Sequence, residues 1–332
     1  MLETFLWYIL IPIGLYWIIT WFLEKKQIEG LNQKVVLITG CDSGFGRDLV
    51  FKCSDAGMPV LAACLTDFGV ESLKKEAKGP GVVTPFKMDV RSDESIEAAK
   101  EIVEEITKKY GGLHGIVNNA GITGASLWDD LLNVKDYIDV MDVNLNGVVR
   151  VTHAFMHLIK KAKGRIVTTA SVCGRISLPL LGPYTCSKYA VEAYCDTLRI
   201  ENAIFGVSVS IIEPGFFKTT LTDPKRITKV FDDIWKRTTK EKRDEYGDKV
   251  FECTKNEMIT MLSERCNKNT YLVVNAYFHA LTSARPRARY PVGLDANLIY
   301  IPVSFLPAPV TDFIFAAVRI IKQFPKPAIL QK

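Results

Sequence analysis

The sequence has no closely spaced cysteine pair, no Asn-x-Ser/Thr sequon and only four histidines. Its eight cysteines are scattered, whereas structural zinc sites use paired thiols or imidazoles at short spacing. A chain of 332 residues with 48% hydrophobic residues can bury a large core without a disulfide framework. We therefore expect reduced thiols and no metal site.

The sequence also lacks an excess of charge of one sign. Its 42 basic and 37 acidic residues leave a net charge of only +5. No basic helix interleaved with stacking aromatic residues is visible, so we expect no nucleic-acid partner.

The first residues lack the features of a cleaved signal peptide, which has a positive start and small residues at the cut. Residues 2–23 carry one charge, Glu3, and a helix of that length would span ~33 Å. We predict an uncleaved membrane anchor over residues 1–24 and a linker over 25–31. Trp7, Trp17 and Trp21 are typical of membrane interfaces, and Lys25 with Lys26 predicts a cytoplasmic catalytic domain. A buried core helix is the alternative.

Six short apolar segments follow, and helical segments separate them. The predicted strands cover residues 34–40, 59–66, 82–90, 114–121, 165–171 and 207–215. The predicted helical segments include residues 45–57, 92–111, 134–164 and 184–205. This alternation predicts an α/β fold, a single Rossmann-type doubly wound parallel sheet, within a domain over 32–290. Ligands bind such sheets beyond the carboxyl ends of the strands.

The alternation stops after the sixth segment. Residues 218–285 are charged and helical, which predicts a lid over a substrate site. Residues 291–332 form an apolar C-terminal extension that is interrupted by Pro302, Pro307 and Pro309. Within it, residues 310–323 fit either a helix on a membrane surface or a helix packed on the domain or a second subunit.

A glycine-rich turn, TGCDSGFG at 39–46, follows the first predicted strand and opens a helix. Gly40, Gly44 and Gly46 let the backbone turn tightly and approach a pyrophosphate, and the helix N-terminus offers free N–H groups. In this position after the first strand, the turn predicts a dinucleotide site.

A second short segment, PYTCSK at 183–188, places Tyr184 and Lys188 one helical turn apart. A positive charge near a tyrosine favours the phenolate, so this pair is typical of a tyrosine that exchanges a proton near neutral pH. Alone, the same spacing is common on solvated helix faces.

Four features together resemble the short-chain dehydrogenase/reductase family over about residues 32–220. They are the TGxxxGxG turn, NNAG at 118–121, a serine ending the fifth strand, and YxxxK at 184–188. ITGCDSGFG, LAACLT, DVNLNGV and IEPGFFKT further resemble the retinol dehydrogenases and hydroxysteroid dehydrogenases of microsomal membranes.

This resemblance implies roles for specific residues. Tyr184 would be the acid/base, and Lys188 would lower its pKa and hold the cofactor ribose. Ser171 would bind the substrate oxygen, and Asn144 would hold a water that relays protons. The implied cofactor-binding residues are Thr39, Gly40, Ser43, Gly44, Phe45, Gly46, Asp89, Asn118, Ala120, Gly121, Tyr184, Lys188, Pro214, Gly215 and Thr219.

The choice of cofactor depends on the end of the second strand. A carboxylate there selects NAD through the ribose 2′-hydroxyl, whereas an arginine binds the 2′-phosphate of NADP. No lysine or arginine occurs between residues 53 and 73, and Asp67 follows the strand. These features favour NAD, while Arg47 in the glycine turn leaves NADP open.

The leading hypothesis is an oxidoreductase that oxidises retinol or a hydroxysteroid with NAD at the endoplasmic reticulum membrane. An NADP-dependent carbonyl reductase and a non-catalytic nucleotide-binding scaffold are the alternatives. We expect a small hydrophobic alcohol and the lipid bilayer as partners. A homo-oligomer is compatible with the resemblance.

Overall fold

The computed structural model describes residues 2–331, except for several side chains of the first helix. The strands are β1 (Val36–Thr39), β2 (Val60–Cys64), β3 (Val83–Lys87), β4 (Gly115–Asn118), β5 (Arg165–Thr169), β6 (Ser208–Pro214) and β7 (Arg289–Val292). The α-helices are α1 (Leu2–Glu24), α2 (Gly44–Asp55), α3 (Asp67–Glu76), α4 (Asp93–Thr107), α5 (Val134–Met141), α6 (Gly147–Ala162), α7 (Gly182–Asn202), α8 (Pro224–Arg237), α9 (Lys240–Tyr246), α10 (Asp248–Glu264), α11 (Tyr271–Thr282), α12 (Ile301–Val303) and α13 (Ala308–Ile321).

All neighbouring strands of the sheet are parallel, in the order β3-β2-β1-β4-β5-β6-β7. Val36 of β1 aligns with Val60 of β2 on one side and with Gly115 of β4 on the other. The strand order therefore reverses at β1, and a ligand crevice is expected at this switch point. The predicted doubly wound parallel sheet is confirmed.

The sheet has a seventh strand that we did not predict from the sequence. β7 extends the sheet beyond β6, with Arg289 aligned to Ile211 and Pro291 aligned to Glu213. Proline lacks the N–H that a central strand needs but is tolerated in an edge strand. The segment was not predicted as a strand because it is rich in proline and arginine.

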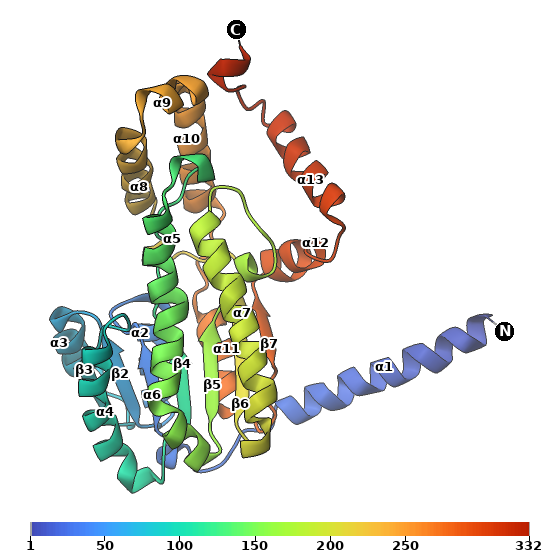
Figure 1. Ribbon diagram of the computed structural model, residues 1–332. Coiled ribbons are helices and arrows are strands. Elements are labelled where there is room, and N and C mark those ends of the chain that lie inside the picture. Colours follow the sequence, from blue (N-terminus) through green and yellow to red (C-terminus); the bar gives the residue numbers. More distant parts are fainter. Residues whose placement is uncertain (1, 332) are drawn as a thin grey trace.

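Helices cover both faces of the sheet (Figure 1). Apolar side chains of α4, α6 and α7 form one core with the strands, and those of α2, α3 and α11 form the other. These two cores fix the carboxyl ends of β1, β4 and β5 relative to one another, which positions the site described below.

The segment predicted as a lid divides into two parts. Helices α8–α10 stand beyond the sheet and share a separate apolar cluster, in which Trp235 and Phe251 stack at 4.4 Å (Figure 1). Helix α11 instead packs on the sheet, with Val273, Tyr277 and Leu281 buried in its core. The structure therefore differs from the prediction at residues 271–282, because the apolar face of α11 completes the second helix layer.

The C-terminal extension continues through η8 (Ala296–Tyr300), α12 and α13. Helix α13 leads back toward α9 and α10, and Lys322 just beyond it pairs with Glu257 of α10 (Figure 1). Many of its apolar side chains are exposed, including Phe313, Ile320 and Ile321.

Helix α1 projects away from the domain, and its last residue connects it to the domain (Figure 1). The Glu24 carboxylate accepts hydrogen bonds from Arg287, and the Glu24 carbonyl accepts one from Ser283 at 2.9 Å. Within the described part of the chain, no helix is both long enough and apolar enough to span a bilayer. The side chains of Trp17 and Trp21, on which the anchor prediction partly rests, lie outside those described.

Candidate active site

A cavity of about 520 Å³ opens at the carboxyl ends of the strands, at the switch point beside β1. Most of the predicted site residues line it together. They are Gly40, Ser43, Gly44, Phe45, Asp89, Ala120, Gly121, Ser171, Tyr184, Lys188, Pro214, Gly215 and Thr219. The fold therefore brings together motifs that are far apart in the sequence.

Four predicted site residues, Thr39, Gly46, Asn118 and Asn144, lie behind the cavity wall and not on it. Thr39 Oγ1 accepts hydrogen bonds from the N–H groups of Asn119 and Ala120, so it joins β1 to the loop after β4. Asn118 is buried and donates to Thr152 Oγ1 at 3.0 Å. Thr39, Gly46 and Asn118 thus support the residues that line this cavity, and their role in cofactor binding stays a prediction.

The glycine-rich turn is shaped to bring its backbone close to a ligand. Gly44 has a φ of +62°, and a Cβ added there would meet only open space. Gly46 differs, because a Cβ there would come within 2.4 Å of the Asn119 amide nitrogen. That amide donates to the carbonyls of Thr39 and Gly40, so Asn119 holds the backbone of the turn in place.

The first turn of α2 faces this cavity. The N-cap residue of the helix is Ser43, and no side-chain cap is formed among the described residues. The Ser43 hydroxyl instead lies 3.1 Å from Thr220 Oγ1. The amide donors and positive dipole end of the helix suit an anion. The turn and the helix therefore fit the diphosphate of a dinucleotide.

Ser171 and Tyr184 both line the cavity, and interaction with the Ser171 side chain opposes the rise in the pKa of Tyr184. Ser171 follows β5, and its Oγ accepts a hydrogen bond from the Cys173 N–H at 3.2 Å. Tyr184 lies in the first turn of α7, after Pro183, which suits a helix start. The site thus holds two hydroxyls that could share one substrate oxygen.

Lys188 lies one turn further along α7 and is buried. Its Nζ donates to the main-chain oxygen of Thr169 at 2.7 Å and lies 5.5 Å from the centre of the Tyr184 ring. Burial lowers the pKa of Lys188 to about 8. Burial raises the pKa of Tyr184, and the nearby Ser171 side chain opposes that effect. The protein groups alone therefore do not produce the lowered tyrosine pKa that the Tyr184–Lys188 spacing led us to expect.

Asn144 lies in a π-helical turn, η4 (Asp142–Asn146), between α5 and α6. Its amide oxygen accepts from the Ile122 N–H at 2.9 Å, and its amide nitrogen donates to the Ile122 carbonyl and to Ser187 Oγ at the same distance. The side chain therefore fixes the loop after β4 against α7, next to Lys188. A π-helical turn inside a helix often marks a functional site.

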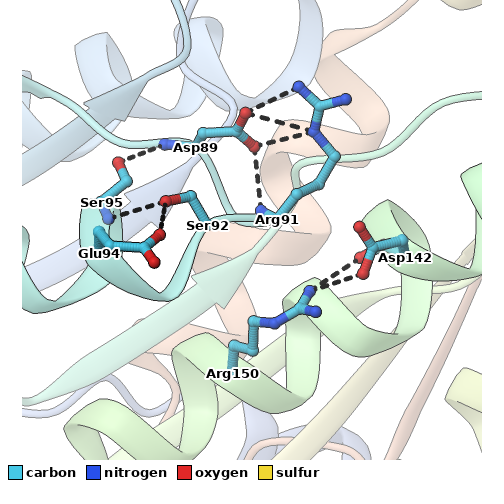
Figure 2. A network of polar contacts seen from close by, with 7 residues as sticks. All are labelled: Asp89, Arg91, Ser92, Glu94, Ser95, Asp142 and Arg150. Atoms are coloured by element: carbon cyan, nitrogen blue, oxygen red, sulfur yellow. Dashed lines mark hydrogen bonds and ion pairs between the residues drawn. The ribbon is translucent and has the colours of Figure 1, made fainter.

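Asp89 occupies the cavity edge after β3, and Figure 2 shows its contacts. Its carboxylate accepts hydrogen bonds from the Arg91 side chain, at 2.7 Å for Oδ2, and from the Arg91 N–H. These hydrogen bonds to Arg91 hold the pKa of Asp89 below its usual range. The same view shows Arg150 joined to Asp142 of η4.

The two residues weighed for cofactor choice lie away from the cavity. The Asp67 side chain is 80% exposed and pairs with Lys87 at 2.8 Å. Arg47 pairs with Glu76 at 2.9 Å and donates to Ser72, so it is directed toward α3. Neither lines the cavity, whereas Asp42 of the glycine-rich turn does.

Several site residues escaped the sequence prediction. Phe216, Ile227, Met258 and Leu262 form an apolar part of the cavity wall, and three of them come from α8 and α10. Asp42 could have been found from its place inside the glycine-rich turn. The apolar residues carry no motif that would distinguish them from core.

Comparison with known proteins finds relatives that match most of this chain. A family model described as short chain dehydrogenase matches residues 34–229, more than half of the chain. Retinol dehydrogenase 16 of Homo sapiens is 41% identical over 307 residues, which cover 92% of this chain and 95% of that protein. The 17-beta-hydroxysteroid dehydrogenase type 6 of Homo sapiens is 40% identical over 316 residues, covering 95% and 96%.

A solved short chain dehydrogenase/reductase from Burkholderia phymatum, in complex with NAD, superposes with a TM-score of 0.63 at 23% identity. The match covers 90% of this chain and 99% of that one. At this identity, the superposition shows that the fold is shared. The predicted resemblance, from the glycine-rich turn to the YxxxK motif, is confirmed by the family model and the two relatives.

Proposed function

The chain belongs to the short-chain dehydrogenase family, and on that premise we propose that it oxidises a hydrophobic alcohol, retinol or a hydroxysteroid, with NAD. One observation carries the proposal. Ser171, Tyr184 and the buried Lys188 line one cavity, and that cavity also has an apolar wall.

Residues around the cavity fit a nicotinamide dinucleotide. The turn at Gly44 and the first turn of α2 would hold the diphosphate, with Thr219 opposite them. Asp89 would lie beside the adenine, Lys188 would bind ribose hydroxyls, and Pro214 with Gly215 would border the nicotinamide. When bound, the oxidised nicotinamide ring would accept a hydride and bring a positive charge close to Tyr184.

Tyr184 acts as the base in this proposal and removes the proton of the substrate hydroxyl at its phenolic oxygen. Ser171 donates a hydrogen bond to the same substrate oxygen and orients it. Because burial raises the pKa of Tyr184, phenolate formation depends on positive charge nearby. Lys188 contributes such a charge below about pH 8, the value to which burial lowers its pKa.

The apolar wall supports a lipid-like substrate. Ile227 of α8 and Met258 and Leu262 of α10 border the cavity, so we propose that α8–α10 form the substrate lid. Burying such a substrate against these side chains removes apolar surface from water, which favours binding by ~25 cal/mol for each Å² buried. The two human relatives are named for retinol and for 17-beta-hydroxysteroids, which are both hydrophobic alcohols.

We also propose that the protein works at the endoplasmic reticulum membrane, with its catalytic domain in the cytoplasm. Exposed apolar residues on α1, such as Trp7, Tyr8 and Ile11, and on α13, such as Phe313 and Ile320, support attachment to lipid. Protease treatment of sealed microsomes tests this topology. Cleavage of the catalytic domain is expected, and its protection would contradict the proposal.

The activity is tested with a panel of retinoids and hydroxysteroids, each incubated with NAD and with NADP. Removing the phenolic hydroxyl in Tyr184→Phe should lower kcat by about 10²–10⁴-fold, the usual contribution of a general base. Tyr189→Phe on the same helix is the matched control, because Tyr189 is exposed. Undiminished turnover by Tyr184→Phe would refute the assigned role.

A further inference from the structure

The carboxylate of Asp42 borders the cavity at the end of β2, where the sequence itself has no acidic strand residue. We infer that Asp42 selects NAD over NADP by accepting a hydrogen bond from the 2′-hydroxyl of the adenosine ribose. This inference rests on the proposed function, because it presumes a dinucleotide in the cavity.

The position of the carboxylate supports the inference. The turn proposed to bind the diphosphate lies at Gly44, and Asp89 borders the cavity after β3. Leu65 and Thr66, which follow β2, line the wall between them. An adenosine that reaches from the first region to the second therefore passes the end of β2, where Asp42 lies.

The hydrogen bonds of Asp42 fix its carboxylate and leave it one acceptor position. Oδ2 accepts from the Leu65 N–H at 2.7 Å, and Oδ1 accepts from the Thr66 N–H at 3.0 Å and from Thr66 Oγ1 at 2.5 Å. An ionised carboxylate has about four acceptor positions, so Oδ2 retains one. Because both oxygens are already oriented, little side-chain entropy is lost when a hydroxyl binds.

The basic residues around this edge are each paired with an acid. Arg47 is paired with Glu76, Lys87 with Asp67, and Arg91 with Asp89. A 2′-phosphate placed here would therefore face the Asp42 carboxylate without an uncommitted cation from these three residues. Like charges at hydrogen-bond distance repel each other, so NADP is disfavoured while NAD gains a charge-assisted hydrogen bond.

Asp67, which the sequence suggested for this task, does not meet these conditions. Its side chain is exposed, pairs with Lys87, and does not border the cavity. Asp67 is therefore the natural control residue for Asp42, because both are acidic and lie near the end of β2.

The test measures dissociation constants by titration calorimetry on the full-length chain in detergent. The ligands are NAD, NADP, and NAD that lacks the 2′-hydroxyl of the adenosine ribose. The expected effect of Asp42→Asn is a roughly tenfold weaker affinity for NAD, the usual size for a lost charge-assisted hydrogen bond. NADP should bind more tightly to this variant, and the 2′-deoxy ligand should bind as it does to the wild type. Asp67→Asn should change none of these affinities.

Two outcomes would overturn the inference. An unchanged ratio of NADP to NAD affinity in Asp42→Asn would show that Asp42 does not bind the 2′-hydroxyl of the adenosine ribose. Equal weakening of all three ligands would show that Asp42 only holds the turn after β2. If Asp42→Asn does not fold, the wild type still decides, because the inference requires it to bind 2′-deoxy-NAD about tenfold more weakly than NAD.

The two proposals fail in different ways. A wild-type protein that binds none of the three dinucleotides contradicts the proposed function as well as the inference. A wild-type protein that binds NAD and NADP equally contradicts the inference alone. Leu65→Arg, at a half-exposed position on the cavity wall, should raise affinity for NADP if the 2′-position lies at this edge.

Discussion

At the scale of single residues, Tyr184 and Lys188 lie on one face of α7, where Lys188 is buried and Tyr184 is half-buried. Burial raises the pKa of the phenol and lowers the pKa of the amine to about 8, so each shift disfavours the charged form. Charging either side chain in this site therefore costs desolvation free energy. Such tension between stability and activity is typical of active sites.

Lys188→Met should make the protein more stable near pH 7, by about 1–3 kcal/mol, while it abolishes activity. The folded state releases the Lys188 proton near pH 8, whereas the unfolded chain retains it until about pH 10.5. The unfolded state thus binds more protons in this window, so wild-type stability rises with pH there and the advantage of the variant shrinks.

Urea denaturation at pH 7 and at pH 10 measures this difference. The exposed Lys161 offers a matched control, because Lys161→Met should change the free energy of unfolding by less than about 0.5 kcal/mol. A Lys188→Met variant that is less stable than the wild type at pH 7 would contradict the account.

Residues in fixed motifs were predictable, whereas their supporting partners were not. The glycine-rich turn and the Tyr184–Lys188 pair were predicted from their spacing, and Ser171 was predicted from the resemblance to the family. Tyr277, in contrast, contacts Asn119 across 158 residues of sequence, at 3.3 Å. No local pattern encodes such a contact, because it exists only after two distant elements have packed.

At the scale of elements, helix α11 contributes more to the site than its sequence indicated. Its Tyr277 is fully buried, and the Tyr277 hydroxyl lies 2.5 Å from Thr169 Oγ1. Thr169 also provides the carbonyl that binds Lys188, and Asn119 supports the glycine-rich turn. Tyr277 therefore links Lys188 to the glycine-rich turn from the opposite face of the sheet.

Tyr277→Phe should lower the free energy of unfolding by about 1–3 kcal/mol, because it leaves the half-buried Asn119 amide oxygen without this donor. The affinity for NAD should fall several-fold as the glycine-rich turn loses support. Thermal unfolding and calorimetry measure the two effects, with Tyr271→Phe at an exposed position of the same helix as the control. Unchanged stability would show that the link is unimportant.

The same scale shows why some elements were predicted and others were not. β1 to β6 are apolar runs next to turn signals, and all six were predicted to within a few residues. β7 was missed because Pro291 and Arg289 are unusual in a strand, although both are tolerated at the edge of a sheet. The boundary between the lid and α11 was missed because both segments are helical.

At the scale of the whole molecule, the parallel sheet brings the glycine-rich turn, Ser171 and Tyr184 to one cavity, although about 130 residues separate the first motif from the second. This convergence follows from parallel strands, whose carboxyl ends share one edge. Helices α8–α10 then add an apolar wall to that edge, and α1 and α13 add exposed apolar surface. The alternation of strands and helices in the sequence was sufficient to predict that the motifs meet at one edge of the sheet. The positions of the apolar wall and of the exposed apolar surface depend on packing.

The central claim is that hydride passes from a substrate carbon to the nicotinamide ring beside Tyr184. The most direct test uses a hydroxysteroid or retinol deuterated at the carbinol carbon, with NAD, and mass spectrometry of the reduced cofactor. The account predicts one deuterium per NADH formed, together with the matching carbonyl product, and almost no labelled cofactor from Tyr184→Phe. Carbonyl product accompanied by unlabelled NADH would contradict it.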